Sequence, residues 1–115
     1  MIIENYNSVY ELKGNFVKST LHIFQKKFEN IFEKENHLTI YTDGLDCIDN
    51  HGMRSIVKLH NDALSKDKRL TIIGLGNQKL YDHLKPLEIS KIKNMGALKV
   101  IQHNFVKLNK WFHSF

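Results

Sequence analysis

Apolar and polar residues alternate near the start of the chain, which is the period of a β-strand. Val9-Tyr10-Glu11-Leu12 has this alternation and is followed by Lys13-Gly14-Asn15, so we predict a strand that ends in a glycine turn. Ile2-Ile3 precedes the polar stretch Asn5-Tyr6-Asn7 and is placed to pair with that strand. The pattern therefore predicts two N-terminal strands joined as a hairpin.

From Ser19 the spacing of apolar residues changes to three and four, which is the period of an amphipathic helix. Lys26, Lys27 and Glu29 occupy the opposite, polar side. Ser19 or Thr20 is expected to cap the helix. The apolar positions are Leu21, Phe24, Phe28, Ile31 and Phe32.

The middle of the chain repeats a strand followed by a helix. Leu38 to Thr42 is rich in β-branched and aromatic residues and predicts a strand, which Asp43-Gly44 is expected to break or bend. The next helix is predicted from about Gly52 to Leu64, with Asp49 or Asn50 placed to cap it. Its apolar face consists of Met53, Ile56, Val57, His60 and Leu64.

A second buried strand is predicted over Leu70 to Ile73, ending in Gly74-Leu75-Gly76. Asn77 can then cap a short helix that carries Leu80, Tyr81 and Leu84. This order of strands and helices indicates a right-handed parallel crossover. Pro86 should end the short helix, and the Leu87-Glu88-Ile89 segment is expected to be an edge strand or a turn.

The last twenty residues contain a further apolar seam, which predicts a C-terminal helix over residues 96–115. Three roles remain open for it: packing on its own domain, self-association or partner binding through the large side chains of Trp111, Phe112 and Phe115, and attachment to a membrane surface. The seam residues are Leu98, Ile101, Phe105, Leu108, Phe112 and Phe115.

Length and composition are those of one ordinary globular domain. The 115 residues leave no room for a second independent core, and 42% of them are hydrophobic and 25% charged, as is typical of globular proteins. Cys47 is the only cysteine, so no internal disulfide can form, and neither a signal peptide nor a long apolar span is present. We therefore expect a cytoplasmic protein without a membrane span.

The net charge of +5 is concentrated in the last third of the chain, where residues 79–115 carry seven lysines against Asp82 and Glu88. Three of these lysines, Lys99, Lys107 and Lys110, accompany the C-terminal seam and could reach anionic head groups. Nucleic-acid binding is not expected because a basic recognition helix is not recognisable in the sequence.

The segment from Leu38 to Tyr41, followed by Ile48-Asp49-Asn50-His51-Gly52-Met53, resembles the strand, Asp-Ser-Ser-Gly-Leu turn and helix of STAS domains. This family includes anti-sigma-factor antagonists and the C-terminal modules of sulfate transporters. The predicted order of elements fits the family over residues 1 to about 85. The resemblance implies a single α/β domain over residues 1–115, with a mixed central sheet and helices chiefly on one face.

The resemblance also marks a difference. In anti-sigma-factor antagonists the serine just before the glycine accepts phosphate from a partner kinase, whereas this chain has His51 there and Asn50 in place of the other serine. A phosphate would add about −1.5 to −2 charges at the turn. The phosphate-controlled switch is therefore expected to be absent, which leaves a module that is always competent to bind or is controlled by another signal.

The resemblance implies a noncatalytic module whose partner is an anti-sigma factor or a related serine-kinase domain. The alternative is a cytoplasmic adaptor of a membrane transport assembly, because STAS domains also occur in transporters and the tail is basic and aromatic. Partner binding is expected to use Asp49, Asn50, His51, Gly52, Arg54, Ser55 and Lys58.

Other chemistries are weaker interpretations of the same residues. Asp43, Asp46, Asp49 and His51 crowd one loop, but they lack the ligand spacing of a calcium or zinc motif, so capping and turn roles explain them better and no metal is expected. The Gly74-Leu75-Gly76-Asn77 turn lacks the remaining residues of a nucleotide motif. Cys47 near His51 is the closest approach to a catalytic dyad, and neither an enzyme nor a cofactor is expected.

Overall fold

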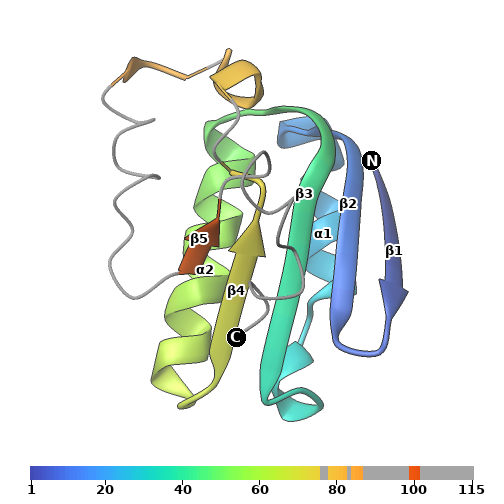
Figure 1. The fold of residues 1–115 in the computed structure, drawn as a ribbon, viewed down its shortest axis with the longest axis vertical. Helices are drawn as coiled ribbons and strands as arrows, with labels where there is room; N and C mark the ends of the chain where they lie inside the picture. Colours follow the sequence, from blue (N-terminus) through green and yellow to red (C-terminus); the bar gives the residue numbers. More distant parts are fainter. Residues whose placement is uncertain (76–77, 83, 87–98, 102–115) are drawn as a thin grey trace.

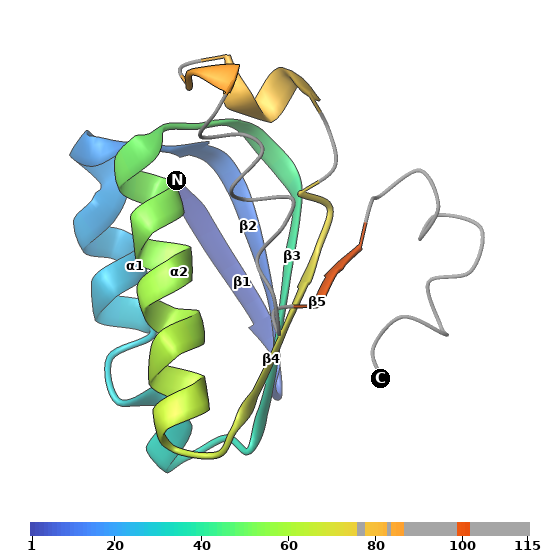
Figure 2. The same ribbon diagram turned by 90° about the vertical axis from the view of Figure 1, so that its left-hand side faces the viewer.

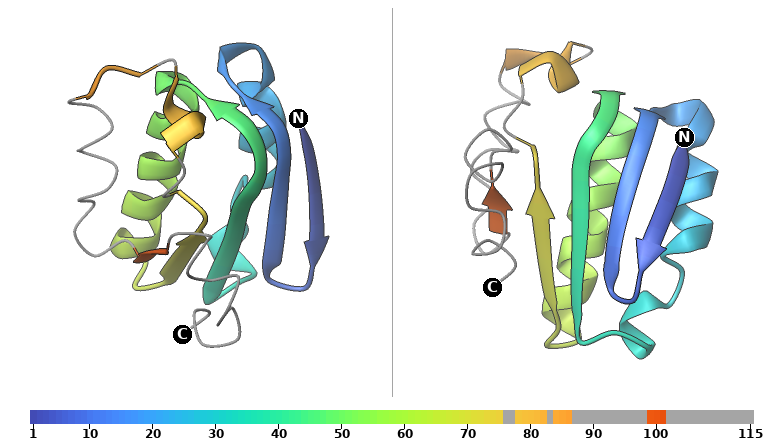
Figure 3. Two further views of the ribbon diagram at one scale, coloured as in Figure 1. Left: turned by 45° about the horizontal axis from the view of Figure 1, so that its top comes forward. Right: turned by 45° about the vertical axis from the view of Figure 1, so that its right-hand side comes forward.

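A five-stranded sheet in the order β1-β2-β3-β4-β5 forms the centre of the computed structural model, which describes residues 1–75, 78–82, 84–86 and 99–101 (Figure 1). Strand β1 (Ile2–Tyr6) pairs antiparallel with β2 (Val9–Phe16), as the predicted hairpin requires. Strands β3 (His37–Ile48), β4 (Arg69–Ile73) and β5 (Lys99–Ile101) continue the sheet in parallel, so the sheet is mixed. Figure 3 shows β1 and β5 at its opposite edges.

Two helices, α1 (Leu21–Lys27) and α2 (Asn50–Ser65), lie side by side on one face of the sheet (Figure 2). Short 3₁₀ helices connect the elements: η1 (Lys18–Thr20), η2 (Ile31–Glu33) and η3 (Gln78–Tyr81). Because α2 joins the parallel neighbours β3 and β4, the predicted strand-helix-strand unit is present. The α/β fold class with helices chiefly on one face is confirmed.

The hydrophobic core lies between the two helices and the sheet. Leu12 and Phe16 of β2 and Ile56 of α2 are at most 1% exposed. Phe24 of α1 stacks between Phe16 and Phe28, with both pairs of ring centroids 4.6 Å apart. Burying each such side chain contributes roughly 1.5–3 kcal/mol, so this aromatic row is the main attachment of α1 to the sheet.

Strand β3 is longer than the sequence predicted, because it continues through Asp43-Gly44 to Ile48. Its pairing with β2 slips twice: Glu11 and Lys13 face Tyr41 and Gly44, and Gly14 and Asn15 face Leu45 and Cys47. Each slip adds one residue to β3 and reverses the inside-outside order of the side chains. The predicted bend is therefore two β-bulges, and the predicted break is wrong.

Strand β2 also continues past its predicted end. Gly14 adopts a φ of 92°, which glycine tolerates and other residues rarely adopt, so the chain turns locally but stays paired as far as Phe16. Leu45 and Ile48 of β3 consequently lie opposite Gly14 and Phe16.

Helix α1 is shorter than predicted. It ends at Lys27, and Asn30 then adopts a left-handed conformation (φ 55°) before η2, although Ile31 and Phe32 remain buried as the apolar pattern required. Thr20 begins the helix, but its hydroxyl donates to the carbonyl of Asn15 at 2.7 Å instead of capping the helix. Because the turn between α1 and η2 keeps the buried residues three and four positions apart, the sequence pattern resembles one longer helix.

The segment after β4 forms η3, where a short helix was expected. Leu80, Tyr81 and Leu84 are buried there as predicted, and the Tyr81 hydroxyl donates to the carbonyl of Leu75. Burial raises the pKa of Tyr81 far above its usual value. Residues Lys99–Ile101 form β5, so a helix beginning at residue 96 is wrong; Trp111, Phe112 and Phe115, the rest of the tail, and the Leu87–Ile89 prediction lie outside the described residues.

Candidate functional site

The β3–α2 corner, defined here as Asp49-Asn50-His51-Gly52, is held in place by one carboxylate. Asp49 is the N-cap of α2, and its Oδ1 accepts a hydrogen bond from the backbone N–H of Gly52 at 2.9 Å. Its Oδ2 accepts a second hydrogen bond, from the backbone N–H of Lys18 at 3.0 Å. Asp49 therefore caps α2 as predicted and also ties the corner to the segment that follows β2.

Gly52 sets the distance between α2 and the sheet. It is buried, and a Cβ atom at this position would lie 2.4 Å from the carbonyl oxygen of Phe16 and 2.9 Å from Cγ1 of Ile48. Gly52 is among the predicted partner-binding residues, but its burial keeps it out of the outward surface, so its direct part in binding is a wrong prediction. Its physical role is to let the first turn of α2 approach β2 and β3 closely.

The remaining predicted residues do reach the surface. Asn50, His51 and Ser55 are half-buried, whereas Arg54 and Lys58 are exposed. Arg54 and Lys58 are one helical turn apart, so two cations lie along the outer side of α2 next to the corner. The corner and the first two turns of α2 thus present polar groups on a rigid helix.

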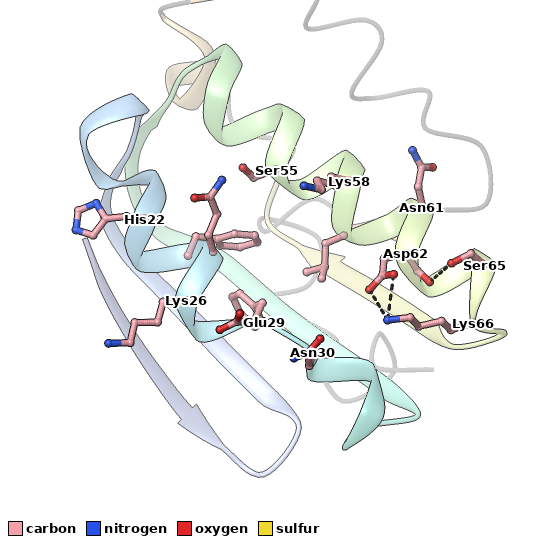
Figure 4. Close-up of a pocket in the computed structure, with 14 residues that line it drawn as sticks. His22, Lys26, Glu29, Asn30, Ser55, Lys58, Asn61, Asp62, Ser65 and Lys66 are labelled. Carbon is pink, nitrogen blue, oxygen red and sulfur yellow. Dashed lines mark hydrogen bonds and ion pairs between the residues drawn. The ribbon is translucent and has the colours of Figure 1, made fainter.

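A groove of about 950 Å³ runs between α1 and α2, and Ser55 and Lys58 lie on one of its walls (Figure 4). Its lining includes three side chains that are at most 7% exposed: Phe24, Phe28 and Leu59. A size of this order is enough for a segment of a partner chain or a small ligand. The groove extends the polar surface at the corner along the helical face of the molecule.

The groove is lined by charged side chains of both signs. Near the C-terminus of α2, Lys66 is paired with Asp62, with Nζ 3.2 Å from Oδ1. Lys58 lies midway along the α2 wall, and Lys26 and Glu29 lie on the α1 wall (Figure 4). Among the described residues, Lys58 and Lys26 form no ion pair, so both cations are available to a partner.

Sequence reasoning missed the α1 wall of this groove, because Lys26 and Glu29 were assigned to a solvent face. A usable signal was available in the predicted topology. Successive parallel crossovers in one direction place their helices on the same face of a sheet, so the polar sides of α1 and α2 should meet along a common line.

Cys47 does not form a reactive dyad with His51 in this structure. Its Sγ donates a hydrogen bond to Oδ1 of Asn15 at 3.2 Å. Burial raises the pKa of the Cys47 thiol, and the negative charges of Asp46, Asp49 and Asp82 raise it further. The neutral thiol is favoured, which is the opposite of what a nucleophilic cysteine needs.

The aspartates of the β3 loop have separate roles. Asp43 lies against Gly74, where an added Cβ would be 2.3 Å from Oδ1 of Asp43 at a backbone φ of 109°. Asp49 caps α2, and Asp46 is exposed. Within the described ranges, no three His, Cys, Asp or Glu side chains gather in a metal-binding arrangement. Close packing also explains Gly74, whereas Gly76 and Asn77 of the same turn lie outside those ranges.

The arrangement of strands and helices matches a known crystal structure, that of a proposed anti-sigma factor antagonist from Thermotoga maritima. The two superpose with a TM-score of 0.67 over 95% of this chain and 92% of that chain. The chain has a STAS-like fold. The two sequences are 13% identical, so this likeness concerns the fold alone.

No protein-family model matches the sequence, and no curated protein matches it. The match to a solved structure therefore supports the STAS-like fold where these two sequence comparisons find nothing. In the part of the chain that the structure describes, no helix combines the length and the apolar content needed to cross a bilayer.

Proposed function

We propose that this STAS-like domain is a noncatalytic regulatory module that binds an anti-sigma factor or a related serine-kinase domain. Its docking surface consists of the β3–α2 corner and the exposed side of α2, through Asn50, His51, Arg54, Ser55 and Lys58. Asp49 and Gly52 act indirectly, because one holds the corner and the other is buried against the sheet.

The observation that carries this proposal is that the polar β3–α2 corner is held in a fixed position. Both carboxylate oxygens of Asp49 accept hydrogen bonds from backbone N–H groups, which ties the first turn of α2, where Asn50 and His51 lie, to the segment after β2. A preorganised surface binds with less loss of conformational freedom than a loop that must be ordered first. The likeness of the fold to a proposed anti-sigma factor antagonist supports the class of partner.

The absence of a hydroxyl group at the corner gives the module a distinct mode of control. Asn50 and His51 cannot accept phosphate from a serine kinase, so the partner cannot be released by adding about −1.5 to −2 charges at this place. The module is therefore always competent to bind its partner, unless a different signal acts on it.

Charge reversal on α2 tests the docking surface. The partners to assay are purified anti-sigma-factor kinase domains, by titration calorimetry against wild type, Arg54→Glu and Lys58→Glu. We expect each variant to bind at least about 10-fold more weakly, which corresponds to about 1.4 kcal/mol. Incubation of the wild type with the same kinase and ATP should leave the corner unphosphorylated by mass spectrometry.

Arg69→Glu is the matched control, because Arg69 is also exposed but begins β4 at the other end of the sheet. Equal loss of affinity in Arg54→Glu and Arg69→Glu would show that only net charge matters. Stoichiometric phosphate on the peptide that contains residues 49–52 would contradict the proposed mode of control.

A further inference from the structure

The sheet face opposite α1 and α2, called the outer face below, is covered unevenly. Tyr6, Val9, Thr39 and Thr71 are register neighbours on four successive strands and share this face. Their exposed fractions fall from 82% through 38% and 5% to 2%. The neighbouring row shows the same trend, from the exposed Glu4 and Glu11 to the half-buried Tyr41 and the fully buried Ile73.

The cover over the β4 side of the outer face is not one of the described helices. Both α1 and α2 lie on the other face, where Leu70 and Ile72 of β4 belong to the core (Figure 2). Thr71 and Ile73 alternate with those residues and therefore point to the outer side. The ring of His37 lies 2.9 Å from the Thr71 hydroxyl and covers part of Thr71, whereas Ile73 is fully buried and outside the core cluster. A strand that is buried on both faces needs a layer of chain on each of them.

Two segments outside the described residues could supply this layer, and the handedness of strand connections decides between them. Residues 87–98 lead from η3 to β5, which is parallel to β4. A right-handed crossover in the same direction as the preceding one runs over the face that carries α1 and α2. Residues 102–115 follow β5 directly and are free of that restriction.

The dimensions of the outer face suit the second segment. Ile101 pairs with Ile73, so residues 102–115 begin one strand away from the fully buried Ile73. The remaining 14 residues would form a helix about 21 Å long at about 1.5 Å per residue. The distance from β5 to β1 is four strand spacings, or about 19 Å.

The chemistry of the segment also matches the outer face. Its apolar residues, Phe105, Leu108, Phe112 and Phe115, follow the three-and-four spacing of one helix side. Lys107 and Lys110 add positive charge to the segment. At the exposed edge of the outer face Glu11 lies opposite Glu4, and the Glu4 carboxylate is paired with Lys13. Of these two carboxylates, Glu11 is therefore the one that a basic segment would meet.

We propose that residues 102–115 form an amphipathic helix that docks on the outer face of its own sheet, from β4 toward β1. Docking converts the two-layer domain into three layers and leaves the α1–α2 side as the surface for other proteins. This inference is independent of the proposed function, because it concerns the opposite face of the sheet.

A photoreactive side chain at position 9 of the full-length protein tests the docking directly. With p-benzoylphenylalanine in place of Val9, we expect crosslinks to peptides from residues 102–115, at a yield that does not change on dilution. The same side chain in place of Asn61, which is exposed on α2, should give no such crosslink. Crosslinks at position 9 that join two copies and disappear on dilution, or that omit the tail, would overturn the proposal.

Trp111 offers a second readout, since it is the only tryptophan in the chain. Leu108→Asp and Phe112→Asp should release the segment, shift the emission of Trp111 to longer wavelength and increase its quenching by iodide. Ser114→Asp, on the opposite side of the predicted helix, should leave both quantities unchanged. A wild-type emission that already equals that of Phe112→Asp, or that shifts to shorter wavelength when phosphatidylglycerol vesicles are added, would show that the segment is free for a membrane surface instead.

Discussion

The backbone N–H of Lys18 donates a 3.0 Å hydrogen bond to Oδ2 of Asp49, 31 residues later in the chain. One side chain thus connects the segment after β2 with the start of α2. We expect Asp49→Ala to lower the free energy of unfolding by about 2–3 kcal/mol, because a helix cap and a charge-assisted hydrogen bond are lost together. Asp49→Asn retains one accepting oxygen and should lose about half as much.

Urea denaturation measures both changes. Asp62→Ala is the control, because Asp62 forms a half-exposed pair with Lys66 within α2 and its loss should cost no more than about 0.5 kcal/mol. If Asp49→Ala is as stable as Asp62→Ala, the tie between the two segments contributes nothing to stability.

Gly52→Ala should destabilise the protein although alanine favours helices. The added Cβ would meet the carbonyl oxygen of Phe16 at 2.4 Å, and backbone cannot rotate away as a side chain can. Overpacking of this kind costs about 1–3 kcal/mol, which exceeds the gain of about 1 kcal/mol in helix propensity. Asn61→Ala, at an exposed position of the same helix, should be neutral or slightly stabilising in the same thermal and urea measurements. A Gly52→Ala protein at least as stable as wild type would contradict the close approach.

Cys47 should react slowly with alkylating reagents near neutral pH. Its raised pKa means that the rate of labelling by iodoacetamide should keep increasing above pH 9, where a free thiol is already mostly ionised. Asp46→Asn removes one of the negative charges responsible and should increase the rate at pH 8. Asp67→Asn, remote at the end of α2, should not. Equal rates in the two variants would show that the Asp46 charge does not reach the thiol.

His60 should make the protein less stable in mild acid. Desolvation lowers the pKa of His60 in the folded protein below its ordinary value of about 6.5. Between the lowered and the ordinary pKa the unfolded chain binds more protons, so this part of the stability is present above about pH 6.5 and is lost as the pH falls through the folded pKa. His60→Gln should therefore show a smaller decrease in unfolding free energy between pH 7 and pH 5. Identical pH profiles would mean that His60 is not desolvated.

Much of the fold could be predicted from the sequence because its core elements are periodic. The apolar spacing in α2 and the continuous β-branched run in β4 each lie within one unbroken element, so period and structure agree. The cap at Asp49 was also predictable, since aspartate before an apolar helical pattern has one favoured role.

The errors occur where two periods meet. Leu45 and Ile48 are three apart in sequence yet point to the same side of a strand, because a bulge lies between them. Helix α1 has the reverse problem, since Phe28 and Ile31 retain helical spacing across a turn at Asn30. The burial of Gly52 depends on the carbonyl of Phe16, a contact between distant residues that no local pattern contains.

The paired slips in β3 have a consequence for tracing the ancestry of this chain. One extra residue inverts the order of facing side chains and a second restores it, so Ile48 returns to the phase set by Leu38 and Ile40. A relative with straight strands would lack one residue at each of two places only a few positions apart. Aligning such sequences requires two single-residue gaps inside one strand, where gaps are normally penalised. Sequence similarity can therefore become undetectable while the fold remains recognisably the same.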